Sequence, residues 1–271
     1  MSRINKIFKN LKAENKKAFV AYICAGDPNF DTSLAVLDAL VEKGVDIIEL
    51  GVAFSDPVAD GLVNQMAAER ALKAGMNMPR LFELVRAFRA KHPDVGLVLF
   101  TYMNPIFSYG YTKFFSDATD AGIDATLFLD LPIEDRAELI PCMGECGMQM
   151  ISLIAPTTPI ERAIELAKNA QGFIYVLTRT GVTGAASTLS LDLEERLAII
   201  RQHTDIPVCL GFGIGTVEQI NDMQANCDGI IVGSALVKQI ENNATDKDAA
   251  VSAVKSFIEP LVIAAHALKT I

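Results

Sequence analysis

The stretch DIIELGV (46–52) begins with Asp46 and continues as an apolar run with one carboxylate, Glu49, inside it. Its apolar residues are nearly continuous rather than alternating, which is typical of a strand buried on both faces of a parallel sheet. Seven more runs of this character occur along the chain. They are AFVAYICAG (18–26), GLVLFTY (96–102), ATLFLDLP (125–132), QMISLIAP (149–156), GFIYVLTR (172–179), PVCLGFG (207–213) and GIIVGSA (229–235). The sequence therefore predicts eight buried strands.

Amphipathic segments typical of helices lie between most of these runs, at 32–43, 79–91, 159–169 and 191–203. A doubly wound open sheet normally has five or six strands, whereas a closed (β/α)₈ barrel has eight. We therefore predict a single TIM-barrel domain over residues 1–271, a length that suits one such barrel. The long interval 53–95 must hold extra structure, and we expect a functional loop and a short helix within 56–75.

The first 17 residues are predicted to form an additional helix that caps the barrel. Their apolar side chains, Ile4, Ile7, Phe8 and Leu11, fall at helical spacing. The alternative is a signal peptide, because basic residues precede the apolar stretch 18–25. That stretch is short and runs into Gly-Asp-Pro, which favours a capping helix followed by a strand.

Composition limits the partners and the chemistry. The chain is 51% hydrophobic and has a net charge of −9, so we expect a large core and no general affinity for nucleic acid or anionic membranes. No continuous apolar run reaches the ~18 residues that span a bilayer. Five scattered cysteines indicate reduced thiols and a cytoplasmic protein. The three histidines lie in helical segments, so no metal site is predicted.

Polar residues at the carboxyl ends of barrel strands are candidates for function, because barrel enzymes place their chemistry there. Alternation along the strand puts Glu49 on the same face as Ile47, and if that face is the interior, partial burial would raise the pKa of the carboxyl group toward the range of a general acid or base. The alternative is a structural carboxylate paired with a neighbouring strand. Asp60 follows the same strand, where it forms either part of the site or an Asx turn. Tyr175 lies within the sixth run and either serves the site or bonds a neighbour.

Glycines after the last two strands predict a phosphate site. Gly211-Phe-Gly213-Ile-Gly215 follows the seventh run, and Gly233-Ser234-Ala235 opens a helical pattern after the eighth. Glycines allow close backbone approach, helix N-termini attract anions, and barrels commonly bind phosphate with these two loops. A dinucleotide fingerprint would need a third glycine that is absent. The small residues of 180–188 suit either a lid or a plain connector.

Seven motifs in order along the chain resemble the alpha subunits of tryptophan synthase. They are AGDP (25–28), ELGVAFSDPVADG (49–61), TYMNP (101–105), DLP (130–132), RTGVTG (179–184), GFGI (211–214) and GSA (233–235). The resemblance implies a barrel that cleaves indole-3-glycerol phosphate to indole and glyceraldehyde 3-phosphate, in tryptophan biosynthesis. It also implies a beta partner in an alpha2-beta2 heterotetramer. No cofactor is expected in this chain, and pyridoxal phosphate is expected in the beta partner.

The resemblance also implies roles for individual residues. Glu49 corresponds to the general acid/base and Asp60 to the second catalytic carboxylate. Thr183 corresponds to a lid threonine that reaches Asp60. The full set of implied substrate contacts is Tyr22, Asn64, Phe100, Tyr102, Tyr175, Thr183, Gly184, Phe212, Gly213, Gly233 and Ser234. The implied contacts with the beta subunit are Asp56, Pro57, Asn104 and Pro132.

Four positions depart from the family pattern. Ala53 stands where proline is usual, Tyr22 where phenylalanine is common, and Leu62 and Asn64 interrupt the usual Pro-x-Ile-Gln. Asn64 would place a polar amide where an aliphatic side chain usually faces the indole. Two alternatives therefore stay open: a catalytically weakened barrel that mainly regulates a beta partner, and another phosphate-binding barrel enzyme such as a phosphoribosyl isomerase.

Overall fold

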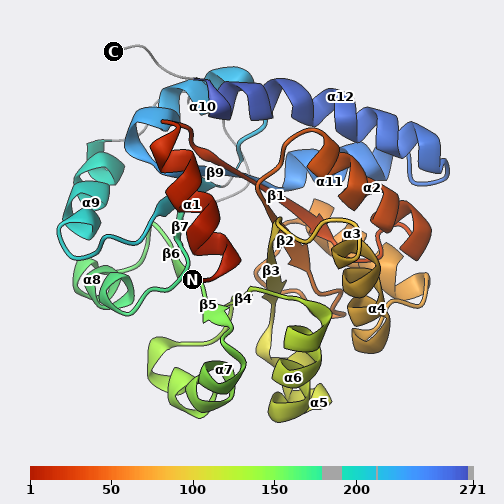
Figure 1. Ribbon diagram of the computed structural model, residues 1–271, viewed down its shortest axis with the longest axis horizontal. Coiled ribbons are helices and arrows are strands. Elements are labelled where there is room, and N and C mark those ends of the chain that lie inside the picture. The colour runs from red at the N-terminus through yellow and green to blue at the C-terminus, as the bar shows by residue number, and fades with distance from the viewer. Residues whose placement is uncertain (179–190, 212, 268–271) are drawn as a thin grey trace.

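Parallel strands form a ring at the centre of the protein (Figure 1). The structure is a computed structural model that describes residues 1–178, 191–211 and 213–267. The strands pair in the order β5-β4-β3-β2-β1-β9-β8-β7-β6. Their bounds are β1 (Ala18–Cys24), β2 (Ile47–Gly51), β3 (Gly96–Thr101), β4 (Ala125–Phe128), β5 (Gln149–Met150), β6 (Ser152–Ile154), β7 (Ile174–Leu177), β8 (Val208–Gly211) and β9 (Gly229–Val232). Every predicted strand is therefore present.

The ring closes between β5 and β6, which are two halves of one predicted strand. Only Ile151 separates them, and its N–H donates to the Thr126 carbonyl oxygen of β4 at 2.8 Å. β5 pairs with β4, and β6 pairs with β7. The predicted eight-stranded barrel is therefore confirmed, with its fifth strand interrupted where it changes neighbours.

Helices surround the strands and follow the expected alternation. Their bounds are α1 (Arg3–Ala13), α2 (Phe30–Glu42), α3 (Leu62–Lys73), α4 (Met78–Arg89), α5 (Met103–Tyr109), α6 (Tyr111–Ala121), η1 (Ile133–Glu138), α7 (Ile140–Cys146), α8 (Ile160–Lys168), α9 (Leu191–Arg201), α10 (Val217–Met223), η2 (Gln224–Asn226), α11 (Ser234–Asn242) and α12 (Lys247–His266). The long interval after β2 holds a loop, α3 and α4, in agreement with the prediction of extra structure there.

The core has two parts, one inside the ring of strands and one between the strands and the helices. Ile47 belongs to the inner cluster, whereas Ile48 and Leu50 belong to the outer one. Because side chains alternate along a strand, Glu49 lies on the inner face with Ile47. The alternation read from the sequence is therefore confirmed for β2.

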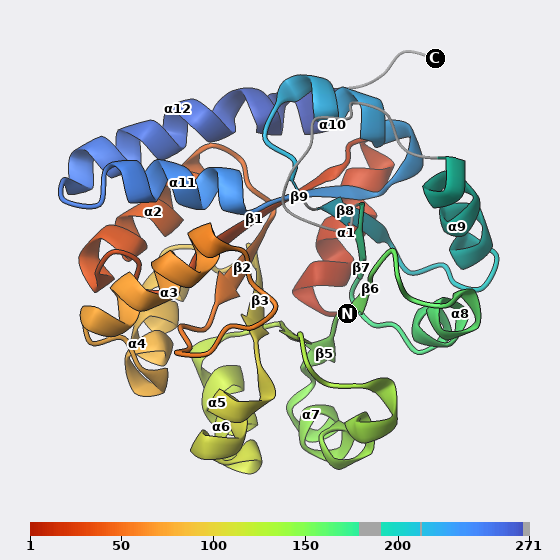
Figure 2. The ribbon, with the colours of Figure 1, turned by 180° about the vertical axis from the view of Figure 1, so that it is seen from behind.

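The helix α1 covers the amino end of the ring. Its buried side chains Ile4, Phe8 and Leu11 join the inner cluster, and the Phe8 ring lies 5.9 Å from that of Phe173. In Figure 1 α1 lies in front of the strands, and in Figure 2, seen from behind, it lies behind them. The predicted capping helix is present, at Arg3–Ala13.

Aspartates at the amino ends of three strands accept hydrogen bonds from neighbouring strands and so hold the ring together. Asp46 accepts a hydrogen bond from the Phe19 N–H at 2.7 Å, and Asp124 accepts one from the Leu97 N–H at 2.9 Å. Asp228 accepts in the same way from the N–H of Val208 at 2.9 Å. These carboxylates therefore serve the fold at the end of the barrel that α1 covers.

Among the described residues, one helix, α12, has the length and composition of a membrane span, although it contains no continuous apolar run long enough. It is 20 residues long with a mean hydropathy of 1.3. It packs along α2 and α11, and its buried face includes Val254, Ile258 and Leu261 (Figure 1). Its packing in the outer layer of the barrel accounts for its apolar residues.

Candidate active site

Glu49 is a buried carboxyl group inside the barrel. It is 1% exposed and lies on β2 beside Tyr22 of β1 and Val98 of β3. Its Oε1 has no hydrogen-bond partner among the residues that the structure describes. Burial raises the pKa of Glu49 to about 8, because an apolar environment disfavours the ionised form. The side chain therefore carries a proton at neutral pH that it is able to give up.

Asp60 is half-buried in the loop after β2 and is held by two side-chain donors. The Tyr102 hydroxyl donates to Oδ2 at 2.8 Å, and the Asn64 amide donates to Oδ1 at 3.4 Å. Tyr102 is fixed in turn, because its hydroxyl accepts the N–H of Ala59 at 2.9 Å. Burial raises the pKa of Asp60, and the two donors oppose this effect. Asp60 thus lies in a more polar environment than Glu49 does.

Aromatic rings surround the two carboxyl groups. The Tyr22 ring lies 5.1 Å from that of Phe100 in an edge-to-face arrangement, and burial, followed by nearby charges that include Asp60 and Glu49, raises the pKa of its hydroxyl. Burial and then the Glu49 charge likewise raise the pKa of Tyr175. Tyr22, which pairs with Glu49 across the sheet, thus lies near both carboxyl groups and Tyr175 lies near Glu49, in an aromatic setting that suits a flat apolar ring.

Two glycines leave room for these tyrosines. A Cβ atom at Gly51 would lie 2.5 Å from the Tyr22 hydroxyl oxygen. A Cβ atom at Gly211 would lie 2.8 Å from the Tyr175 ring and hydroxyl. Both distances are too short for nonbonded atoms, so the absence of a side chain at each glycine is what allows the tyrosine to lie there.

The glycine loops after β8 and β9 lie beside each other. Gly213 has a φ of +74°, and a Cβ atom at Gly215 would lie 3.0 Å from the Ala235 Cβ. The N–H of Gly215 is already bound by the Gln219 side chain at 2.8 Å. In contrast, Gly233 caps α11 without a side-chain hydrogen bond, so the first turn of α11, from Ser234, offers backbone donors.

The predicted site residues fall into three groups. The structure brings Glu49, Asp60, Tyr22, Asn64, Phe100, Tyr102 and Tyr175 together at one rim, and a Cβ atom at Gly233 would lie 3.5 Å from the Tyr22 Cβ. Gly213 and Ser234 follow the neighbouring strands β8 and β9. Thr183, Gly184 and Phe212, together with the predicted lid, lie outside the described residues.

The residues predicted to contact a partner follow β2, β3 and β4 in the chain, and most of them are exposed. Asp56, Asn104 and Pro132 are exposed, and Pro57 is half-buried. Nearby in sequence, Val58 is 86% exposed and Phe107 is 68% exposed. A contiguous apolar patch that faces water is typical of protein interaction sites, whereas single exposed apolar side chains are common.

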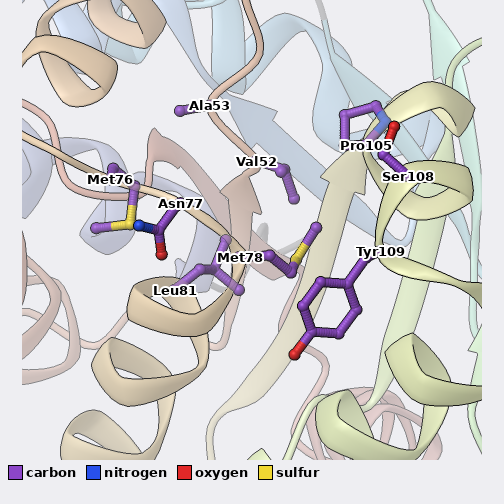
Figure 3. Close-up of a pocket in the computed structure, with 9 residues that line it drawn as sticks. All are labelled: Val52, Ala53, Met76, Asn77, Met78, Leu81, Pro105, Ser108 and Tyr109. Carbon is purple, nitrogen blue, oxygen red and sulfur yellow. The ribbon is translucent and has the colours of Figure 1, made fainter.

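A cavity of about 240 Å³ opens near these residues (Figure 3). It lies between the segment after β2, the turn from α3 to α4, and α5. Its lining residues are Val52, Ala53, Met76, Asn77, Met78, Leu81, Pro105, Ser108 and Tyr109. Neither Glu49 nor Asp60 lines it, so it is distinct from the carboxylate pair.

An ion pair that the sequence analysis did not identify joins α3 to the loop after β1. Arg70 donates to both oxygens of Asp27, at 2.7 and 3.0 Å, and its third nitrogen lies 3.3 Å from Glu241 of α11. The Asp27 side chain is fully buried, and burial raises its pKa although Arg70 opposes this. The motif AGDP contains Asp27, but its partner is 43 residues away in the sequence.

Comparison with known proteins identifies the family. The family model described as tryptophan synthase alpha chain matches residues 8–266. The tryptophan synthase alpha chain of Opitutus terrae is 47% identical over 243 residues, which are 90% of this chain and 91% of that protein. That of Desulfatibacillum aliphaticivorans is 44% identical over 91% of this chain and 93% of its own. The crystal structure of the alpha subunit from Legionella pneumophila str. Paris superposes with a TM-score of 0.88 at 33% identity, covering all of both chains. This chain belongs to the tryptophan synthase alpha chain family.

Proposed function

We propose that Glu49 and Asp60 together carry out the family's reaction, the cleavage of indole-3-glycerol phosphate to indole and glyceraldehyde 3-phosphate. The observation that carries this proposal is the contrast between the two carboxyl groups. Glu49 is buried with a raised pKa and an oxygen that has no partner among the described residues, whereas Asp60, which is a neighbour of Tyr22 as Glu49 is, is held by two donors. Two carboxyl groups in such different environments are suited to different tasks.

Glu49 is proposed as the general acid and base. The bond between indole C3 and the glycerol carbon breaks in a retro-aldol step, which needs a proton delivered to C3 and a proton removed from the hydroxyl group of the leaving carbon. A carboxyl group with a pKa of about 8 is protonated at neutral pH, so it is able to protonate C3 first. The carboxylate that results then accepts the hydroxyl proton.

Asp60 is proposed to stabilise the charged intermediate. Protonation of C3 leaves positive charge on the indole nitrogen, and an ionised carboxylate that accepts the ring N–H offsets that charge. The Tyr102 hydroxyl and the Asn64 amide favour the ionised form of Asp60, since both donate to it. They also hold the carboxylate in one orientation.

The phosphate group is proposed to bind at Gly213, Gly233 and Ser234, with Gly184 and Phe212 as further expected contacts. The start of α11 supports this proposal, because its first N–H groups and the helix dipole favour an anion. A bound phosphate fixes one end of the substrate, so that the scissile bond is held near Glu49. The chain itself is expected to need no cofactor.

Glu49→Gln tests the proposal. It removes the titratable proton and retains the size of the side chain, so indole formation should fall by roughly 10²–10⁴-fold. Glu83→Gln, at an exposed position on α4, is the matched control and should leave the activity unchanged. Full activity in Glu49→Gln would refute the proposal. Indole release by the isolated wild-type chain would at the same time rule out a purely regulatory role.

A second proposal concerns the beta subunit with which alpha chains of this family associate. We infer that it docks on the surface of Asp56, Pro57, Asn104 and Pro132, together with the exposed side chains of Val58 and Phe107. The same inference extends to an alpha2-beta2 assembly in the cytoplasm, with pyridoxal phosphate held by the partner.

Charge placed on this surface tests the docking proposal. Phe107→Asp should weaken binding of the beta subunit, measured by calorimetry, by at least tenfold, because an aspartate would be buried at an apolar contact. Ile263→Asp is the matched control, since Ile263 is 63% exposed on α12. Equal affinities for the two variants would exclude Phe107 from the interface.

A further inference from the structure

Asn64 is a polar side chain at the rim whose chemistry the proposed mechanism uses only in part. It lies in the first turn of α3, four residues after Asp60. Its Nδ2 donates to Asp60 Oδ1 at 3.4 Å, and its backbone N–H donates to the Gly61 carbonyl oxygen at 3.0 Å. The amide group is therefore held against the carboxylate by the start of the helix.

The other end of the amide, Oδ1, is buried and has no donor in the part of the chain that the structure describes. Turning the amide over would not help, because Oδ1 would then face Asp60 Oδ1 and two acceptors would oppose each other. A buried carbonyl oxygen without a donor is unfavourable, so a partner is expected when the site is filled. Asn64 lies beside Asp60, where the indole ring N–H is proposed to bind, so we expect the donor for this oxygen to come from that ring.

We propose that Asn64 Oδ1 is a second acceptor for the ring N–H of indole-3-glycerol phosphate, beside the Asp60 carboxylate. This inference rests on the proposed function, which places that N–H at Asp60. The substrate offers few donors: the ring N–H and the glycerol hydroxyl groups, while its ionised phosphate offers none. The glycerol chain leads away from the ring toward the phosphate, so the N–H is the donor nearest to Asp60.

A neutral amide suits this position for an electrostatic reason. When C3 is protonated the N–H becomes more acidic, and the carbonyl dipole of Asn64 stabilises it without adding a second negative charge. A second carboxylate would instead raise the pKa of Asp60 by repulsion. Asn64 thereby strengthens the selection for a ring N–H that Asp60 already provides, which an aliphatic side chain at this position would not do.

Binding of two matched ligands tests the inference. One is indole-3-propanol phosphate, and the other is the same molecule with the ring N–H replaced by sulfur, a benzothiophene. Calorimetry on the full chain gives the ratio of their dissociation constants in the wild type, Asn64→Leu and Asn64→Ala. The matched control is Gln65→Leu, because Gln65 also donates an amide hydrogen to Asp60, but to its backbone oxygen at 2.7 Å.

The wild type should bind the indole ligand more tightly than the benzothiophene ligand. In both Asn64 variants the ratio of the two dissociation constants should fall by about fivefold, which is the effect of one hydrogen bond. Gln65→Leu should weaken the binding of both ligands alike and leave the ratio of their dissociation constants unchanged. An unchanged ratio in both folded Asn64 variants, with their folding checked by thermal unfolding, would show that Oδ1 serves the protein and would overturn the inference. The proposed function fails separately, through an active Glu49→Gln, and no binding of the indole ligand to the wild type would overturn both.

Discussion

Replacing Glu49 by glutamine should make the stability of the protein less dependent on pH. In the folded protein the pKa of Glu49 is about 8, against 4.5 for an ordinary glutamate in the unfolded chain. Between these values the unfolded chain releases the proton while the folded protein keeps it. A rise in pH therefore favours unfolding of the wild type, and this effect is absent in Glu49→Gln.

The magnitude follows from the two pKa values. They differ by about 3.5, which corresponds to about 5 kcal/mol of unfolding free energy. This contribution to stability is fully present below pH 4.5 and is lost as the pH rises through 8. At pH 7 the wild type should have lost about 3 kcal/mol of it relative to the variant. Because Glu49 is 1% exposed, little of the effect is screened by solvent.

Urea unfolding of both proteins at several pH values between 5 and 9 measures this difference. The glutamine amide adds a constant offset, since its own polar atoms are buried too, so the change with pH is the quantity to compare. Parallel curves for the two proteins over this range would refute the reasoning. The measurement needs no substrate and is therefore independent of the proposed catalytic role.

Two further perturbations follow from contacts at the site. Tyr102→Phe removes a donor from Asp60 and should raise the pKa of that carboxyl group further, which moves the acidic limb of the kcat/KM profile to higher pH; an unmoved limb would contradict this. Arg70→Met leaves the Asp27 carboxylate buried without its partner and should lower the unfolding free energy by roughly 3–5 kcal/mol in urea titrations. Lys73→Met, at an exposed position on the same helix, should change it by less than about 0.5 kcal/mol, and equal losses would argue against the ion pair.

Local pattern was enough to predict the barrel and the position of Glu49. Continuous apolar runs mark strands buried on both faces, and the two-residue period of a strand places Glu49 with Ile47 inside the ring. The glycines after β8 and β9 predict a phosphate site from another local property, their conformational freedom, and that site is still a proposal. The catalytic roles themselves came from the resemblance to the family and remain proposals.

Contacts between residues that lie far apart in the sequence could not be predicted from the local sequence pattern. The pairing of Asp27 with Arg70 spans 43 positions, and no periodicity connects them. The interruption of the fifth strand at Ile151 depends on how the ring closes, which is a property of the whole sheet. The hydrogen bond between Asn64 and Asp60 joins residues only four apart, but it depends on α3 beginning at Leu62, and helix boundaries are the least certain part of a sequence prediction.

Because α1 covers one end of the barrel, it limits where small molecules can enter and leave. With Ile4, Phe8 and Leu11 filling that end, the substrate and both products of the proposed reaction would pass at the opposite end, where the loop that holds Asp60 lies. A subunit bound over that end would control the release of indole into water. Glyceraldehyde 3-phosphate would have to leave by the same route. The order in which the two products leave would then depend on this open end of the barrel rather than on the reaction itself.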